Sequence, residues 1–133
     1  MVAIVIIVYN LDARVFLLQM EAIKKFCKDE FEVHVFDNST NLEQAEGIRY
    51  HCDIGGISYK KTQSASRNGS ESHSFAANLS FELLKNKPFK YYFYLDHDCI
   101  PIKPFSVVEM LGIKIIAGLG QQGGKKYFWP GCV

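Results

Sequence analysis

Tyr91-Tyr-Phe-Tyr-Leu95-Asp96-His97-Asp98 is an aromatic, apolar run that ends in two carboxylates, one residue apart. Its first five residues favour strands and carry no charge, which predicts a β-strand buried on both faces, as in a parallel sheet. The two carboxylates would then lie where a buried strand meets solvent. In open α/β sheets, ligands bind at that end of the strands.

An Asp-x-Asp turn offers oxygen ligands to a divalent cation and leaves other positions around the cation vacant for phosphate oxygens. The sequence therefore predicts a metal and diphosphate site at Asp96 and Asp98. An acidic turn that merely ends a strand has the same pattern. The choice between these two interpretations depends on the rest of the chain.

Strand and helix patterns alternate along the rest of the chain. Strands are predicted at residues 2–9, which are mostly apolar, at 31–36, which alternate, and at 57–60 and 113–117. Strands separated by helices favour an α/β fold with a mainly parallel central sheet and helices on both faces. The length of 133 residues suits one continuous core, so a single domain over residues 1–133 is predicted.

Helical spacing marks the segments between the strands. The first helix is expected to follow Asp12, with an apolar face formed by Val15, Leu18, Ala22 and Phe26. Thr40 and Glu43 have the spacing of a capping box for a second helix that ends near Tyr50.

The second half of the chain is predicted to begin with its longest loop, residues 62–74, which are rich in Ser, Gly and Asn. The next helix has a predicted face of Phe75, Leu79 and Leu83. Ser106 and Glu109 form a second capping-box pattern for a short helix. A loop rich in glycine and glutamine is expected at residues 118–124, and a strand closes the chain.

Composition indicates an ordinary soluble protein. A net charge of +1 gives no reason to expect a nucleic-acid or membrane-surface partner. The apolar first strand is far shorter than the roughly 20 residues of a membrane span, and no basic region precedes it, so a cytoplasmic protein is predicted. The four cysteines (Cys27, Cys52, Cys99 and Cys132) form no CxxC pair, and reduced thiols are expected. A zinc cluster of His51, Cys52, His97 and Cys99 is an alternative.

The order of the motifs resembles that of the nucleotide-sugar-binding part of GT-A-type glycosyltransferases. The matching segments, which together span nearly the whole chain, are Tyr9-Asn10, Phe36-Asp37-Asn38-Ser39, His73-Ser-Phe-Ala-Ala-Asn78, Leu95-Asp96-His97-Asp98, Ile115-Ile-Ala-Gly-Leu-Gly120 and Tyr127-Phe-Trp129-Pro-Gly131. The resemblance implies a Rossmann-like GT-A fold. It also implies transfer of a sugar from a nucleotide-diphosphate donor to a carbohydrate or glycoconjugate acceptor.

The resemblance assigns roles to these residues. Asp98, and Asp96 directly or through water, would hold Mn²⁺ or Mg²⁺, which neutralises the diphosphate as a Lewis acid. The implied nucleotide-binding residues are Tyr9, Asn10, Asp37, Asn38, His73, Asn78 and Asp96. The implied pocket for donor and acceptor consists of His97, Gln121, Trp129 and Gly131.

Structural interpretations stand beside these roles. Asp37 and the two residues after it are also common in turns. Tyr9 and Asn10 could simply form the loop that follows a strand. Trp129 could be a residue of the hydrophobic core.

Other functions remain open at this point. A phosphoacceptor receiver domain also ends a strand in Asp before a proline-containing loop, although its acceptor lies near the middle of the domain and Asp96 lies late in the chain. A degenerate module would bind the nucleotide sugar and transfer nothing. A nucleotidyltransferase needs a glycine-rich loop after the first strand, and residues 9–14 contain no glycine.

The end of the chain carries a further expectation. Glycosyltransferases of this fold usually continue well past the metal motif and, in inverting members, supply a carboxylate base there. No Asp or Glu follows Glu109, so no general base is identified and a C-terminally short enzyme is expected. Its final strand is expected to be unpaired and to favour a homo-oligomer.

Overall fold

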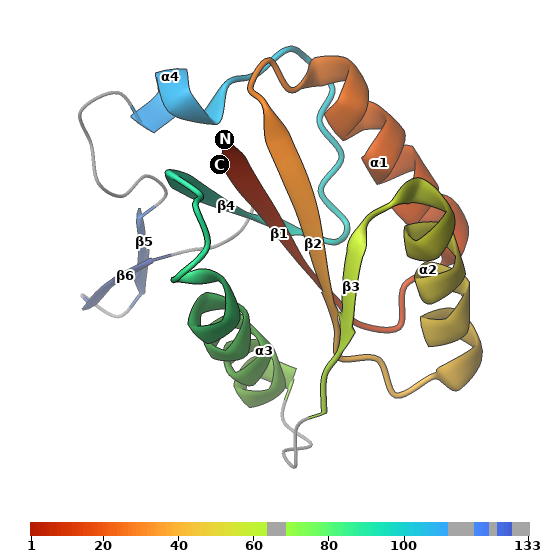
Figure 1. Cartoon of the computed structure of the whole chain (residues 1–133). Coiled ribbons are helices and arrows are strands. Elements are labelled where there is room, and N and C mark those ends of the chain that lie inside the picture. Colours follow the sequence, from red (N-terminus) through yellow and green to blue (C-terminus); the bar gives the residue numbers. More distant parts are fainter. Residues whose placement is uncertain (64–68, 112–118, 123–124, 129–133) are drawn as a thin grey trace.

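The computed structural model describes residues 1–63, 69–111, 119–122 and 125–128. Four parallel strands form one sheet in the order β3-β2-β1-β4 (Figure 1). These strands are β1 (Val2–Val8), β2 (Phe31–Asp37), β3 (Ser58–Lys61) and β4 (Tyr91–Asp96). The predicted α/β fold with a mainly parallel sheet is confirmed.

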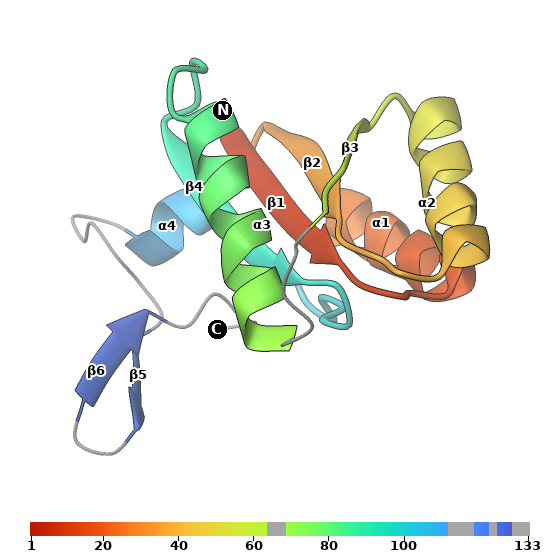
Figure 2. The ribbon, with the colours of Figure 1, turned by 90° about the horizontal axis from the view of Figure 1, so that it is seen from below.

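Helices cover both faces of this sheet (Figures 1 and 2). Helices α1 (Ala13–Phe26) and α2 (Leu42–Gly55) pack on one face, and α3 (Gly69–Leu84) packs on the other. Every residue of β1 is buried, because Ile4 and Ile6 face α1 and α2 while Val5 and Ile7 face α3. The apolar first strand is therefore the centre of both cores.

Strand β4 is less buried than its apolar sequence predicts. Leu95 is buried, but the other residues of the strand are partly exposed. In the described sheet, β4 is an edge strand that pairs with β1 alone, which explains this difference.

The buried face of α1 agrees only in part with the predicted one. Phe16 and Ile23, which are not among the predicted residues, face the sheet. Of the predicted residues, Ala22 is buried but Leu18 is 55% exposed. Apolar residues occur on several sides of this helix, so periodicity does not choose the face. The polar Gln19, which is also buried, obscures the pattern further.

Helix α3 corrects two expectations. It begins at Gly69, so the predicted loop at residues 62–74 ends earlier, and residues 64–68 lie outside the described part of the chain. Its sheet-facing side carries Ala76 and Ser80, while Phe75, on the predicted face, is 43% exposed. The small side chains of Ala76 and Ser80 leave room for the helix to approach the sheet.

The helix caps follow the chemistry of their sequences. Asp12 caps α1 by accepting a hydrogen bond from Arg14 N. Asn41, and not the predicted Thr40, caps α2, which continues past Tyr50 to Gly55. Gly56 then ends α2 in the left-handed conformation, with φ of 65°.

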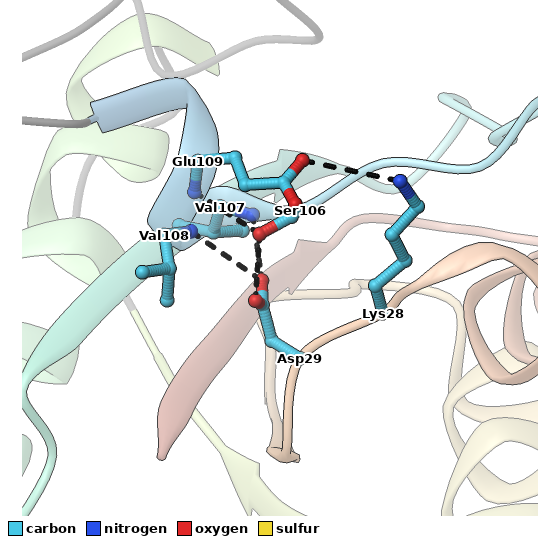
Figure 3. A network of polar contacts seen from close by, with 6 residues as sticks. All are labelled: Lys28, Asp29, Ser106, Val107, Val108 and Glu109. Atoms are coloured by element: carbon cyan, nitrogen blue, oxygen red, sulfur yellow. Dashed lines mark hydrogen bonds and ion pairs between the residues drawn. The ribbon is translucent and has the colours of Figure 1, made fainter.

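The short helix α4 (Val107–Leu111) is anchored at the amino-terminal end of the sheet (Figure 3). Ser106 Oγ accepts from Glu109 N at 3.0 Å, as its capping-box pattern predicts. Asp29 then accepts from Ser106 Oγ at 2.7 Å and from Val107 N at 2.6 Å. Glu109 lies 3.9 Å from Lys28 Nζ instead of closing the box.

An antiparallel hairpin of β5 (Leu119–Gln122) and β6 (Lys125–Phe128) follows. Strand β5 occupies part of the predicted loop at residues 118–124. Strand β6 pairs with β5, whereas residues 129–133, which include the expected unpaired end of the chain, lie outside the described residues, so the homo-oligomer stays a prediction. The predicted strand at residues 113–117 lies outside the described residues.

None of the helices in the described residues is both long enough and apolar enough to cross a membrane.

Candidate metal and nucleotide site

The strand order places a topological switch point between β1 and β4. From β1 the chain moves to β2 and β3 on one side, whereas β4 pairs with the opposite edge of β1. Ligands of open α/β sheets bind outside the carboxyl ends of the strands at such a point. Tyr9 and Asn10 follow β1 there, and Asp96 ends β4 directly beside them, in register with Ile7.

The acidic turn after β4 brings its carboxylates together. Cys99 N donates to Asp96 O at 3.0 Å and closes the turn. Asp96 is partly buried and Asp98 is exposed, and their ligand atoms and that of Cys99 all lie within 4.8 Å of one another. Two carboxylates that share one turn suit a hard cation such as Mg²⁺ or Mn²⁺.

Cysteine chemistry differs from the expectation of reduced thiols. Cys99 is disulfide-bonded, so its sulfur does not offer a thiolate to a metal, and Asp96 and Asp98 remain as the candidate ligands in the acidic turn. Cys27 and Cys52 are free, and burial raises the pKa of Cys52 to about 12. With Cys52 buried in α2 and Cys99 in a disulfide, the alternative zinc cluster is not assembled.

The surroundings of Asp96 disfavour its charged form. Burial is the largest cause that raises the pKa of Asp96, and the negative charge of Asp98 raises it further. His73 and His97 lower it, because a positive charge on either ring would favour the carboxylate. A bound cation would do the same, so the residues present fit a divalent metal.

His97 joins the two strand ends that flank the switch point. Its Nδ1 accepts a hydrogen bond from Tyr9 N at 3.0 Å. A nitrogen that accepts carries no proton, so in the neutral ring this contact places the hydrogen on Nε2. The ring thereby keeps a donor beside the acidic turn, and the Tyr9 side chain remains 49% exposed.

Asp37 is placed differently from its predicted binding role. It is fully buried at the end of β2, where Oδ1 accepts from Ser39 N at 2.9 Å and Oδ2 accepts from Tyr59 OH at 2.7 Å. Burial, and then this hydrogen bond, raise the pKa of Tyr59. Both carboxylate oxygens are therefore engaged inside the protein, and this geometry does not favour a contact with a base or ribose.

Asn10 links the loops that follow β1 and β2. It adopts a positive φ of 46°, and its Oδ1 accepts from Thr40 N and Asn41 N at 3.0 and 2.9 Å. Its own N donates to Ser39 Oγ at 2.8 Å. These bonds fix the loop that leads away from the first strand.

Asn38 links β2 to the segments on its other side. The residue is buried, its Nδ2 donates to the carbonyl and hydroxyl oxygens of Ser72, and its Oδ1 accepts from Thr62 Oγ1 at 3.1 Å. Asn38 thus ties the start of α3 to the sheet.

Of the remaining predicted site residues, two have described side chains and three do not. His73, on α3, is partly buried and close enough to Asp96 to influence its charge, whereas Asn78 is exposed and lies roughly opposite the sheet-facing Ala76 on the helix. Gln121 belongs to β5, and no position is described for its side chain. Trp129 and Gly131 lie outside the described residues.

Gln19 is the site residue that sequence reasoning missed. From α1 its Nε2 donates to Asp96 O and to Cys99 O, each at 2.7 Å. A glutamine within an otherwise apolar helical face is the one signal in the sequence that could have indicated such a contact.

Searches of the sequence against protein-family models and against curated proteins found no match. The glycosyltransferase resemblance therefore depends on the motif residues themselves and on where the fold places them.

Proposed function

We propose that this chain binds a nucleotide-diphosphate sugar through a divalent cation held by Asp96 and Asp98, and that it acts as a glycosyltransferase. The observation that carries the proposal is the position of the acidic turn. It lies at the switch point of a parallel sheet, where Asp96 has a raised pKa that a cation would lower.

The side chains around the turn suit a nucleoside diphosphate. The cation, Mn²⁺ or Mg²⁺, would neutralise the two phosphates and support departure of the nucleotide. His97 Nε2–H and His73, which both influence the charge of Asp96, are assigned to phosphate oxygens. The exposed ring of Tyr9 is assigned to stacking on the base.

The hydrogen bonds of Asp37 and Asn38 favour structural roles over the predicted contacts with the nucleotide. Asp37 and Asn38 hold the strand ends that carry the site, and ligand contacts are not assigned to them. The acceptor, a carbohydrate or glycoconjugate, is assigned to the side of Gln121, Trp129 and Gly131 by resemblance alone.

The strand order weighs against a receiver domain. Receiver domains of the flavodoxin-like type have the order 2-1-3-4-5, so the strand that follows the second helix pairs with β1. Here β3 pairs with β2, and β4 takes the place beside β1.

The disulfide bond of Cys99 weighs against the predicted cytoplasmic location, because the cytosol of most organisms keeps protein thiols reduced.

Thermal shift and titration calorimetry test the proposal directly. A panel of nucleoside diphosphates is measured with Mn²⁺ and with EDTA, and ligand at 100 times Kd should stabilise the fold by about 2.7 kcal/mol. Asp98→Asn should abolish the nucleotide binding that depends on metal. Asp53→Asn, which changes an exposed aspartate on α2, should leave that binding unchanged. Equal nucleotide affinity in Mn²⁺ and in EDTA would refute the metal site.

Turnover separates an enzyme from a degenerate module. With the bound donor identified, hydrolysis of the nucleotide sugar or transfer to an acceptor library is followed by mass spectrometry. Metal-dependent binding with no release of nucleotide diphosphate would identify a binding module without transfer activity.

A further inference from the structure

We infer that Gln19 is a positioning residue that holds the acidic turn in the shape needed to bind a cation. The inference rests on the proposed metal site at Asp96 and Asp98, and it concerns a residue of α1 that contacts neither carboxylate. Gln19 is 0% exposed and lies on the buried face of α1, between Phe16 and Ile23. A buried amide is unfavourable unless it is hydrogen-bonded, so its contacts must account for its presence.

The contacts of Gln19 fix both ends of the acidic turn. Its Nε2 donates to Asp96 O, where the turn begins, and to Cys99 O, where the turn ends, each at 2.7 Å. Asp96 O also accepts from Cys99 N, so this carbonyl is held from two sides. The two amide protons thus secure the backbone on either side of Asp98, from which one proposed ligand projects.

The orientation of the amide is determined by its partners. Two carbonyl oxygens accept at one end of the side chain, so that end must be the nitrogen. The other end, Oε1, is buried and has no hydrogen-bond partner in the described part of the chain. A buried acceptor without a partner lowers stability. A methionine would fill nearly the same space without this loss, but it would remove the hydrogen bond that Gln19 donates to Cys99 O, so the effect of Gln19 is to hold this backbone in place.

Outer-shell residues that orient metal ligands typically change metal affinity 10- to 100-fold when they are replaced. Gln19→Met keeps the volume of the side chain and removes both donors, so the turn should loosen while the core stays filled. We expect the variant to fold, to bind Mn²⁺ at least about tenfold more weakly, and to exchange the Cys99 amide hydrogen faster than the wild type. Gln44→Met, the same change on α2, is the matched control.

Mn²⁺ affinity is measured by electron paramagnetic resonance, and amide exchange is measured on the metal-free protein. If folded Gln19→Met binds Mn²⁺ as tightly as the wild type and its Cys99 amide exchanges at the wild-type rate, the inference is overturned. Gln19→Asn, which keeps the amide and shortens its reach, provides the same comparison if Gln19→Met does not fold.

The two measurements, Mn²⁺ affinity and exchange of the Cys99 amide, distinguish failure of this inference from failure of the proposed function. Wild-type protein that binds no Mn²⁺ overturns the proposed metal site. Exchange at Cys99 then decides on Gln19 by itself, since a faster rate in the variant supports control of the turn and an unchanged rate refutes it.

Discussion

The carboxyl group of Asp96 lies in surroundings that disfavour its charge. Its pKa is raised, first by burial and then by Asp98, although His73 and His97 act in the opposite direction. Between the unfolded and folded pKa values the folded chain holds more protons than the unfolded chain, so stability falls as the pH rises through that interval. At neutral pH, a metal-free protein therefore carries an unfavourable charge at this position.

Asp96→Asn should remove this charge together with a metal ligand. We expect its melting temperature in EDTA to equal or exceed that of the wild type, and we expect Mn²⁺ to give no further increase. Differential scanning calorimetry at pH 7 measures both. Asp53→Asn, at an exposed site on α2, is the control and should keep the wild-type response to Mn²⁺. A clearly lower melting temperature for metal-free Asp96→Asn would show that this carboxylate supports the fold.

His34 should make the fold sensitive to acid. It is buried in β2, edge-on to Phe89 at 5.2 Å, and its Nε2 lies 3.4 Å from Glu32 without forming a normal hydrogen bond. Burial is the main cause that lowers the pKa of His34, with a smaller contribution from Lys87, while Glu32 opposes it. The unfolded chain therefore takes up this proton first, at its ordinary pKa of about 6.5, and stability falls as the pH drops below that value.

The urea midpoint should thus decrease from pH 7 to pH 5, and His34→Gln should flatten that part of the profile. His51→Gln, on α2, serves as the control for the loss of a histidine elsewhere. If His34→Gln reproduces the wild-type pH profile, another group is responsible for the acid sensitivity.

At the scale of elements, the strands of the parallel sheet could be predicted from the sequence, but β5, the start of α3 and the helix faces could not. Apolar runs in the sequence indicate the strands of the sheet. Asp12 and Ser106 indicate where helices begin, because their side chains can accept hydrogen bonds from the first turn of a helix. In α1 the buried face includes the polar residue Gln19, which a hydrophobic pattern does not indicate. In α3 the sheet-facing positions include the small residues Ala76 and Ser80, which a hydrophobic pattern does not single out.

Asp37 joins the carboxyl end of β2 to the side chain of Tyr59 on β3, and these hydrogen bonds should contribute to stability. Asp37→Ala leaves Tyr59 OH and Ser39 N without their partner, so we expect a loss of about 1–3 kcal/mol in the free energy of unfolding. Tyr59→Phe, which removes one of the two bonds, should cost less. Urea denaturation measures both variants. An Asp37→Ala protein of wild-type stability with weaker binding of a nucleoside monophosphate would restore the ligand contact predicted from the sequence.

At the scale of the whole molecule, the candidate site combines residues that the sequence separates widely. The location of Asp96 and Asp98 at a strand end could be predicted from local pattern. The bond from Tyr9 to His97 joins residues 88 positions apart, and the bonds from Gln19 reach 77 and 80 positions along the chain. Such contacts arise from the strand order, because β4 is placed beside β1, and no local pattern in the sequence encodes them.

The two ends of the sheet should behave as independent units. Asp29 anchors α4 at the amino-terminal end, whereas Asp98 lies beyond the carboxyl end, about 20 Å away if β1 has ordinary strand geometry. Substitutions that far apart without shared partners usually add to within about 0.5 kcal/mol.

Asp29→Ala removes the acceptor for Val107 N and Ser106 Oγ, so we expect it to lower the free energy of unfolding by about 1–2 kcal/mol. It should leave Mn²⁺ affinity unchanged, because the acidic turn is held by Gln19 from the middle of α1 and not by the segment after that helix. Asp98→Ala should abolish Mn²⁺ binding with little effect on the metal-free fold. Urea denaturation in EDTA should give the double variant the sum of the two single effects. A coupling well above 0.5 kcal/mol, or weaker Mn²⁺ binding by Asp29→Ala, would show that α1 transmits changes between the two ends of the sheet.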